Sequence, residues 1–268
     1  NSFERYGYAP IETPAMENIS TLSGKYGDEG DRLIFKILNS GDYLSKATFS
    51  DQIESKSLTK QISEKALRYD LTVPFARFVA QNRNDIIFPF KRYQMQNVWR
   101  ADKPQKGRYR EFFQCDADIV GTKSLLCEIE LIQLYDDVFT KLNISGVKIC
   151  INNRKILSGI IELMNATDRF DEIVILLDKI ETLGQENLYN LLKEKGLAKD
   201  SISILNDFLN VSNLEDLSKL MQSSKIGMQG INELSYVYNA VNNVKLKTAV
   251  LQYDVSLARG LDYYTGCI

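Results

Sequence analysis

Histidine is absent from this chain of 268 residues, so the sequence lacks the commonest metal ligand in proteins. The four cysteines contain no CxxC pair; they are Cys115, Cys127, Cys150 and Cys267. Both absences argue against a zinc site, and isolated cysteines are typical of reduced thiols in a cytoplasmic protein. No run of 18 apolar residues predicts a membrane-spanning helix, and the first residues lack the pattern of a signal peptide.

An excess of one charge sign is also missing, since the net charge is −2. No positive field over the whole surface therefore favours nucleic acid. With 44% hydrophobic and 25% charged residues, the chain can bury a sizeable core, as one large domain with an insertion or as two domains.

The sequence starts without Met in "NSFERYGY", which is typical of a helix end, and stops within a strand-like "YYTGCI". We therefore expect a fragment trimmed at both ends.

The first 65 residues predict extended segments and turns. Pro10 and Pro14 forbid a helix around them and favour an edge strand or an extended segment. Residues 28–48 predict a hairpin that turns at "NSGD", and residues 49–65 predict a polar loop.

A short helix is predicted next, in "LRYDLTVPFARFVAQN", where Thr72 is a candidate N-cap and Pro74 suits the first turn. Alternating patterns over residues 91–100 and 109–120 then predict an antiparallel hairpin with a long charged tip of about eight residues. A long amphipathic helix follows in residues 123–142, with apolar positions at Leu125, Ile129, Ile132 and Tyr135.

Helical spacing dominates residues 153–243, and few β-branched runs interrupt it. A strand pattern returns in "KTAVLQYDVSLARGLDYYTGCI". The sequence therefore predicts an α+β fold in which a discontinuous core, residues 1–152 and 244–268, carries an all-helical insertion at residues 153–243.

Alternation in the hairpin separates two faces of its return strand, because side chains two residues apart share a face. One face is polar and carries Phe112, Gln114, Asp116 and Asp118. The other face carries Phe113, Cys115, Ala117 and Ile119, and we expect it to pack on helices. The outgoing strand matches the polar face with Arg92, Gln94, Gln96, Val98 and Arg100. A polar face of this kind either contacts bulk water or lines a ligand site.

Positive charge is concentrated at this hairpin. Residues 91–110 hold one acidic residue, Asp102, and seven basic residues: Lys91, Arg92, Arg100, Lys103, Lys106, Arg108 and Arg110. Arginine suits phosphate oxygens, so a polyphosphate or a nucleic-acid backbone is the natural partner. The alternative is a solvated basic hairpin that only keeps a sheet edge soluble.

A second candidate segment is "LARGLDYYTG" near the end of the chain. Arg259 stands beside Gly260, whose backbone permits a close approach to a ligand. Tyr263 and Tyr264 are adjacent in a strand pattern, so only one of them can face a site. The alternative is a glycine-flanked turn that leads into an aromatic strand.

Three segments in the same order together resemble the histidyl-tRNA synthetases, which are class II aminoacyl-tRNA synthetases. The segments are "ALRYDLTVPFARFVAQN", "VWRADKPQKGRYREFFQCDADIVG" and "LARGLDYYTG". The second resembles motif 2 of that family, and "FERYGYAPIETPAMEN" resembles motif 1, which forms the homodimer interface. The resemblance covers nearly all of residues 1–165 and 245–268. It implies a mixed, mostly antiparallel sheet flanked by helices, with the helical block as the family's insertion domain.

The resemblance implies that histidine attacks the α-phosphate of ATP, which enters with Mg²⁺, and that the histidyl group then passes to the 3′ end of tRNA(His). Arg100 and Arg259 would bind the α-phosphate and stabilise the charge that develops there. Arg108 would reach the ATP phosphates. No metal bound by the protein itself is implied.

The same resemblance assigns the amino-acid pocket. Asp70 and Thr72 would hold the α-amino group, and Gln114 would contact the backbone atoms of histidine. Asp118 would read the imidazole together with Tyr264, or with Tyr263 if that ring faces the pocket. A carboxylate suits this role because it accepts a hydrogen bond from a ring N–H, which an apolar ring of the same shape cannot supply.

Two features of the family are missing from the sequence, namely motif 3 and the C-terminal anticodon-binding domain. We therefore expect this chain alone to activate histidine poorly.

One alternative function is that of the regulatory subunit of ATP phosphoribosyltransferase, a non-catalytic relative that senses histidine. A second rival is a nucleic-acid-binding module that uses Tyr93, Trp99 and Tyr109 as stacking platforms. Tyr93 and Trp99 are predicted on the face opposite Arg100, which favours core packing.

Overall fold

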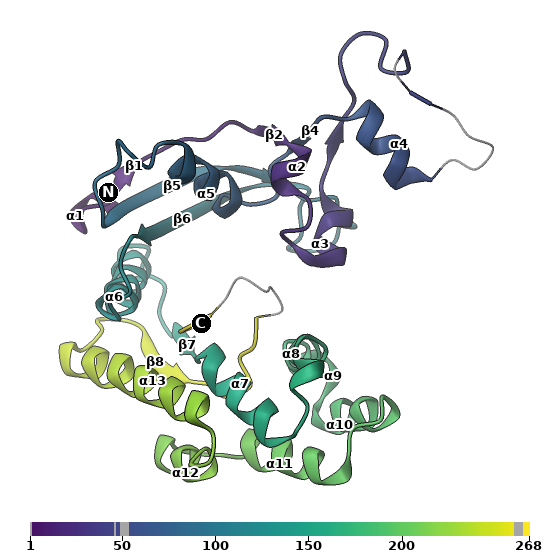
Figure 1. Cartoon of the computed structure of the whole chain (residues 1–268). Helices are drawn as coiled ribbons and strands as arrows, with labels where there is room; N and C mark the ends of the chain where they lie inside the picture. Colours follow the sequence, from purple (N-terminus) through teal and green to yellow (C-terminus); the bar gives the residue numbers. More distant parts are fainter. Residues whose placement is uncertain (1, 46, 49–53, 260–264) are drawn as a thin grey trace. The chain divides into compact units, whose positions relative to one another are not determined.

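The computed structural model describes residues 2–45, 47–48, 54–259 and 265–268. They form two compact units, one made of residues 3–122 and one made of residues 123–268 together with Ser2. Helices and strands occur in both units (Figure 1), and three of the five strand pairings among the described residues are antiparallel. The predicted α+β class is confirmed.

The first unit is built on a long antiparallel hairpin of β5 (Phe90–Trp99) and β6 (Glu111–Val120), as the alternation predicts. Strand β1 (Ala9–Pro10) joins β5 in parallel at the edge of the sheet, a position that tolerates a proline. Helix α5 (Thr72–Gln81) packs on β5. The rings of Phe75 and Phe78 have centroids 6.2 and 6.5 Å from that of Phe90.

A second small sheet lies in the same unit, with the order β2 (Met16–Asn18), β4 (Lys65–Leu67) and β3 (Lys36–Ile37). Both pairings are antiparallel. The short helices of this unit are α1 (Ser2–Arg5), α2 (Ile19–Leu22), α3 (Gly27–Leu33) and α4 (Ser55–Ile62). A buried cluster joins the helices to the sheet and consists of Leu22, Tyr26, Ile34 and Ala66.

The predicted hairpin at residues 28–48 is wrong, because its first part is helix α3 and its strand β3 pairs with β4. The "NSGD" turn instead binds the end of α4. The Asn39 N–H donates to the Ile62 carbonyl at 2.8 Å, and the Asn39 side chain accepts from the Glu64 N–H at 2.9 Å. The predicted polar loop at residues 49–65 is wrong where α4 forms, since "SKSLTKQI" consists mainly of residues that a helix tolerates well.

The second unit contains a two-stranded parallel sheet of β7 (Lys148–Ile151) and β8 (Val250–Tyr253), which lie on either side of the helical block in the sequence. Helix α6 (Leu126–Lys141) precedes β7. The elements between the strands are α7 (Arg154–Leu163), a 3₁₀ turn (Thr167–Arg169), α8 (Phe170–Leu177), α9 (Ile180–Leu183), α10 (Gln185–Glu194), α11 (Lys199–Leu209), α12 (Leu214–Leu220) and α13 (Lys225–Val244). Residues 123–152 belong to the same compact unit as these helices. The division of roles among residues 1–152, 153–243 and 244–268 stays a prediction.

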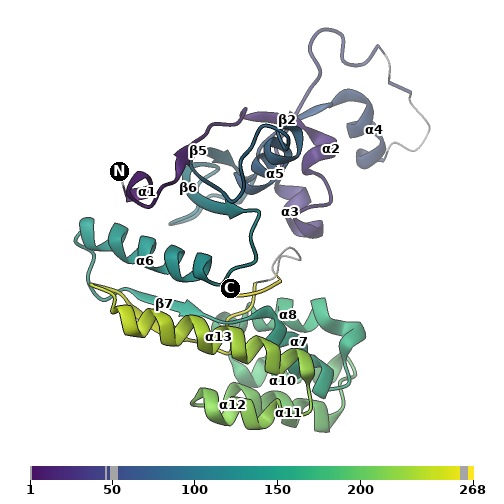
Figure 2. The ribbon, with the colours of Figure 1, turned by 60° about the vertical axis from the view of Figure 1, so that its left-hand side comes forward.

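Helices α7 and α13 run close together at three glycines (Figure 2). A Cβ atom added to Gly159 would lie 2.5 Å from the Gly227 Cα, and one added to Gly230 would lie 2.8 Å from the Ile156 backbone nitrogen. The absence of side chains at these positions therefore allows the two backbones to meet. Around the contact lies the core of this unit, which includes Ile156, Leu157, Ile160, Leu234, Val237 and Val241.

Helix α6 is confirmed, but one of its four predicted apolar contacts is wrong. Ile129 and Ile132 are buried, whereas Tyr135 is 56% exposed. The neighbouring Asp136 is buried instead, because its carboxylate accepts the backbone N–H groups of residues 247, 248 and 249 at 2.7, 2.9 and 2.7 Å. These bonds hold the start of β8 against α6.

Candidate functional site

The register of the β5–β6 hairpin places the predicted polar residues on one face. Residues directly opposite each other in an antiparallel pair point to the same side. The opposite pairs on this face are Arg92 with Asp118, Gln94 with Asp116, Gln96 with Gln114 and Val98 with Phe112. Figure 1 shows β5 and β6 side by side along their length. The hairpin therefore gathers basic, amide and acidic groups from two strands.

The opposite face of the hairpin differs from the prediction. Phe113 is 74% exposed and Cys115 is also exposed, so the expectation that this face packs on helices is wrong for both residues. Helix α1 covers only the far end of the face, where the Phe3 ring stacks on the ring of Tyr93 with centroids 4.8 Å apart. Tyr93 is thus a core residue, as predicted, and not a platform for bases.

Arg100 lies just beyond β5 and is held between two aromatic rings. Its guanidinium lies 4.3 Å from the ring centroid of Tyr69 and 5.2 Å from that of Phe112. Its Nε donates to the Tyr69 carbonyl at 3.2 Å. Among the described residues, no carboxylate forms an ion pair with this guanidinium. The side chain is therefore fixed in place with its cationic end available to an anion.

Asp70 supplies a buried carboxylate just before helix α5. It accepts hydrogen bonds from the Tyr26 hydroxyl at 2.9 Å and from the Val73 N–H at 3.2 Å. Asp70 therefore binds a backbone N–H of the first helical turn. The prediction of Thr72 as N-cap is wrong, because Leu71 is the N-cap and Thr72 is already the first residue of the helix. Burial raises the pKa of Asp70, and the two hydrogen bonds oppose that rise.

Arg92 lies under the polar face and has no exposed side-chain surface. Its Nη2 forms an ion pair with Asp118 at 2.5 Å, and its guanidinium lies 4.2 Å from the ring centroid of Phe75 on α5. Burial lowers the pKa of Arg92, while Asp118 opposes that change. Burial likewise raises the pKa of Asp118, and Arg92 opposes that rise. Arg92 thus holds the predicted imidazole-binding carboxylate in place.

Asp116 is a second acidic group on this face to which sequence reasoning gave no role. Burial, followed by repulsion from Asp118, raises the pKa of Asp116 to about 6. Two amide oxygens on the same face, Gln94 Oε1 and Gln114 Oε1, are buried and accept no hydrogen bond among the described residues. Arg92 Nε and Nη1 on the same face are also buried and donate no hydrogen bond among the described residues, so the face offers a ligand both acceptors and donors. The alternation at every second residue already grouped these side chains, but their burial could not be read from it.

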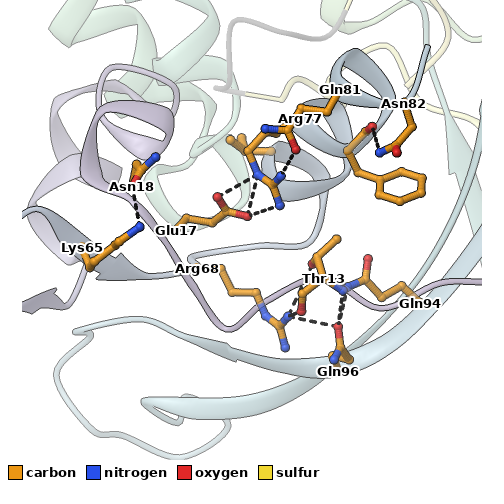
Figure 3. Close-up of polar contacts among 12 residues, drawn as sticks. Thr13, Glu17, Asn18, Lys65, Arg68, Arg77, Gln81, Asn82, Gln94 and Gln96 are labelled. Carbon is orange, nitrogen blue, oxygen red and sulfur yellow. Dashed lines mark hydrogen bonds and ion pairs between the residues drawn. The ribbon is translucent and has the colours of Figure 1, made fainter. Parts of the chain in front are cut away.

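A buried hydrogen-bond network fixes the orientation of Gln94 (Figure 3). Its Nε2 donates to the Thr13 hydroxyl at 2.8 Å and to Gln96 Oε1 at 2.6 Å. Arg68 Nη1 donates to the same Gln96 oxygen at 3.0 Å and to the Thr13 carbonyl at 2.5 Å. Thr13 thereby ties the extended N-terminal segment to the floor of the hairpin.

The loop between β5 and β6 presents Arg108 to solvent, with a side chain that is 64% exposed. Arg108 Nη1 lies 3.2 Å from the carboxylate of Asp102 in the same loop. Gly107 has a φ of +79°, a conformation that favours glycine and allows the tip to turn back. The loop therefore carries a cation near the site without fixing it in one deep pocket.

Arg259, the remaining predicted phosphate ligand, belongs to the second unit. Its backbone carbonyl accepts a hydrogen bond from Arg154. Tyr263 and Tyr264 lie outside the described residues. Within the described ranges, no group of three or more acidic or cysteine side chains is arranged to hold a metal ion, and no helix is both long and apolar enough to cross a membrane.

Comparison with known proteins supplies the family. The family model described as histidyl-tRNA synthetase matches residues 1–268. The chain is 54% identical over 273 residues to the histidine–tRNA ligase of Christiangramia forsetii and 51% identical over 292 residues to that of Flavobacterium johnsoniae. These matches cover 99% and 100% of this chain but only 60% and 62% of the relatives, so the chain spans about 60% of their length.

Solved structures agree with this assignment. The crystal structure of histidyl-tRNA synthetase from Nostoc sp. PCC 7120 matches with a TM-score of 0.76 and 30% identity, covering 99% of this chain and 57% of that one. An ATP phosphoribosyltransferase regulatory subunit/histidyl-tRNA synthetase from Bacillus halodurans matches with a TM-score of 0.74 but only 21% identity, over 99% of this chain and 64% of that one, and so shares the fold. The resemblance inferred from the three sequence segments is confirmed: the chain belongs to the histidyl-tRNA synthetase family.

Proposed function

We propose that this protein activates L-histidine with ATP to form histidyl-adenylate and passes the histidyl group to the 3′ end of tRNA(His). The observation that carries the proposal is the polar face of β5–β6, where Gln114 and Asp118 share one side of β6 and the guanidinium of Arg100, just beyond β5, lies against Phe112 of the same face. Membership of the histidyl-tRNA synthetase family supports the same reaction.

The phosphate chemistry is assigned to arginines. Arg100 binds the α-phosphate, and its two ring contacts keep the guanidinium in one orientation as charge develops on the phosphorus. Arg108 on the loop reaches the outer phosphates of ATP, which enters as its Mg²⁺ complex. Arg259 adds a second cation at the α-phosphate. Adenylate formation then depends on positioning and electrostatics, which require no histidine side chain from the protein.

The amino-acid site is assigned to the acidic part of the same face. Asp70 and Thr72 bind the α-amino group of histidine, and Gln114 contacts its backbone atoms. Asp118 accepts a hydrogen bond from an imidazole N–H, with Tyr264 or Tyr263 on the other side of the ring. The unpaired, buried Gln114 Oε1 supports this assignment, because a buried acceptor is stabilised when a ligand N–H reaches it.

We also propose that the protein works in the cytoplasm as a homodimer that forms through the motif 1 region at residues 3–18. The insertion helices are proposed to face the tRNA.

The alternative function is that of the regulatory subunit of ATP phosphoribosyltransferase. The arginines Arg100, Arg108 and Arg259 favour the synthetase, since a histidine sensor needs no such set for ATP. Titration with ATP in a calorimeter separates the two, because a sensor would show no ATP binding in this pocket.

The decisive experiment measures histidine-dependent exchange of pyrophosphate into ATP with the full-length protein. We expect Arg100→Ala to lower kcat by at least about 100-fold, because it removes a cation that contacts the transition state. Arg110→Ala is the matched control, since Arg110 is exposed and its Nε donates to the Asp102 carbonyl at 3.1 Å. Equal losses in both variants, or wild-type rates in Arg100→Ala, would contradict the proposal.

A further inference from the structure

Three consecutive polar residues, Asn152, Asn153 and Arg154, lead from the end of β7 into the first residue of α7 and are all buried. Burying a polar group is unfavourable unless the fold supplies it with hydrogen-bond partners. Three such groups in succession therefore indicate a specific task for this short connection. The partners of Asn152 and Arg154 lie about 100 residues later in the sequence, on both sides of residues 260–264.

The upstream side is held by side chains. Asn152 Nδ2 donates to the carbonyls of Val255 and Leu257 at 3.2 and 2.9 Å. The guanidinium of Arg154 donates to the carbonyl of Arg259. The bonds thus reach every second carbonyl over residues 255–259, the segment that ends at Arg259.

The downstream side is held by the backbone. The Asn152 N–H donates to the Ile268 carbonyl, and the Ile268 N–H donates to the Asn152 carbonyl, both at 2.9 Å. The Arg154 N–H donates to the Gly266 carbonyl at 2.8 Å. These are the bonds of a short antiparallel pairing centred on Asn153 and Cys267. Residues 152–154 therefore bind both described flanks of residues 260–264.

The connection is itself fixed to the helical core. Asn153 Oδ1 caps α7 by accepting the Lys155 N–H at 2.9 Å, and Asn153 Nδ2 donates to Glu233 on α13 at 2.9 Å. The guanidinium of Arg154 lies 4.8 Å from the ring centroid of Phe170 on α8. Side chains that are packed and hydrogen-bonded in this way have little rotamer freedom, as a support for a functional residue requires.

We propose that Asn152 and Arg154 are positioning residues that hold the backbone of Arg259 in its working place. The proposal rests on the proposed function, in which Arg259 binds the α-phosphate of ATP. A phosphate ligand displaced by about 1 Å loses much of its effect on rate. Asn152 and Arg154 act through the carbonyls of residues 255–259 and touch no substrate.

The test is a double-mutant cycle in pyrophosphate exchange with the full-length protein. We expect Arg154→Ala to lower kcat about 10- to 100-fold while the KM for histidine changes little, and Arg154→Lys to recover part of the rate because an ammonium still donates to the carbonyl. In an Arg259→Ala background, Arg154→Ala should cause little further loss. Lys148→Ala is the control on the preceding strand, since Lys148 is exposed and its side chain takes no part in these bonds, and it should leave kcat unchanged.

Hydrogen exchange gives a readout that does not depend on activity. In Arg154→Ala and Asn152→Ala, peptides that cover residues 255–259 and 266–268 should exchange faster than in the wild-type protein and in Lys148→Ala. Unchanged exchange, faster exchange with a wild-type kcat, or losses that multiply in the double mutant would each overturn the proposal. A wild-type protein without histidine-dependent exchange would instead refute the proposed function, and hydrogen exchange would still show whether these residues hold the segment.

Discussion

Replacing Asp116 with asparagine should stabilise the first unit above pH 6. Burial and the neighbouring Asp118 raise the pKa of Asp116 from its ordinary value of 3.8 to about 6. A carboxyl whose pKa is raised by folding contributes stability that is complete below the ordinary pKa and is lost as pH rises through about 6. At pH 7 the ionised Asp116 therefore destabilises the fold, and Asp116→Asn removes that charge without changing the shape of the side chain.

The magnitude follows from the pKa values. One pKa unit corresponds to about 1.4 kcal/mol, so the difference between 3.8 and about 6 is worth at most about 3 kcal/mol at pH 7. Partial exposure of Asp116 reduces this, and we expect Asp116→Asn to increase the free energy of unfolding by about 1–3 kcal/mol at pH 7. At pH 4 the carboxyl is protonated in the folded protein, so the variant and the wild type should have nearly equal stability.

Urea unfolding followed by tryptophan fluorescence measures this directly, because Trp99 is the only tryptophan and lies on β5 in the same unit as Asp116. Glu111→Gln is the control, since it removes a charge from an exposed position of the same strand and should change stability by less than about 0.5 kcal/mol. A stability difference between Asp116→Asn and wild type that does not grow between pH 4 and pH 7 would refute the reasoning.

Three further predictions concern the supports of the fold. Burial raises the pKa of Asp136, but hydrogen bonds from three backbone N–H groups outweigh burial and lower the pKa overall, so the contribution of Asp136 to stability is present above its ordinary pKa and is lost as pH falls. Asp136→Asn should lower the free energy of unfolding by about 2–3 kcal/mol at pH 7 and by less at pH 3, as measured by thermal unfolding with circular dichroism. Gly159→Ala should destabilise the second unit by about 1–3 kcal/mol in urea, because its Cβ would clash with the Gly227 backbone, and wild-type stability would contradict that packing. Arg77→Met should lower the free energy of unfolding by about 3 kcal/mol, because it leaves the buried Glu17 without the guanidinium that contacts it at 2.8 Å. Recovery of most of that stability in the double variant with Glu17→Gln would confirm the reason.

The hairpin and its faces could be predicted from the sequence because the alternation of polar and apolar residues extends over two strands of ten residues each. Such a pattern fixes the register and therefore which side chains share a face. The same pattern did not show which face is buried, so Phe113 was assigned to the core although it is 74% exposed. Burial depends on elements that pack from elsewhere in the chain, such as α5, whose Phe75 covers Arg92.

Local signals were misleading where long-range partners decide the structure. The "NSGD" segment has the composition of a hairpin turn, yet Asn39 binds the end of α4 through residues about 25 positions later. Thr72 has the residue type of an N-cap, but it lies inside the helix, and the carboxylate of Asp70 accepts the Val73 N–H from three residues earlier. Residues 152–154 look like an ordinary polar loop, because the side-chain partners of Asn152 and Arg154 lie more than 100 residues away.

The central claim is that the polar face of β5–β6 binds histidine and ATP, and a structure of the full-length protein with both ligands and Mg²⁺ tests it most directly. The account predicts an imidazole N–H within hydrogen-bonding distance of Asp118, the α-amino group at Asp70, and α-phosphate oxygens at the guanidinium of Arg100. Histidine bound away from Asp118, or phosphates that do not contact Arg100, would contradict the account.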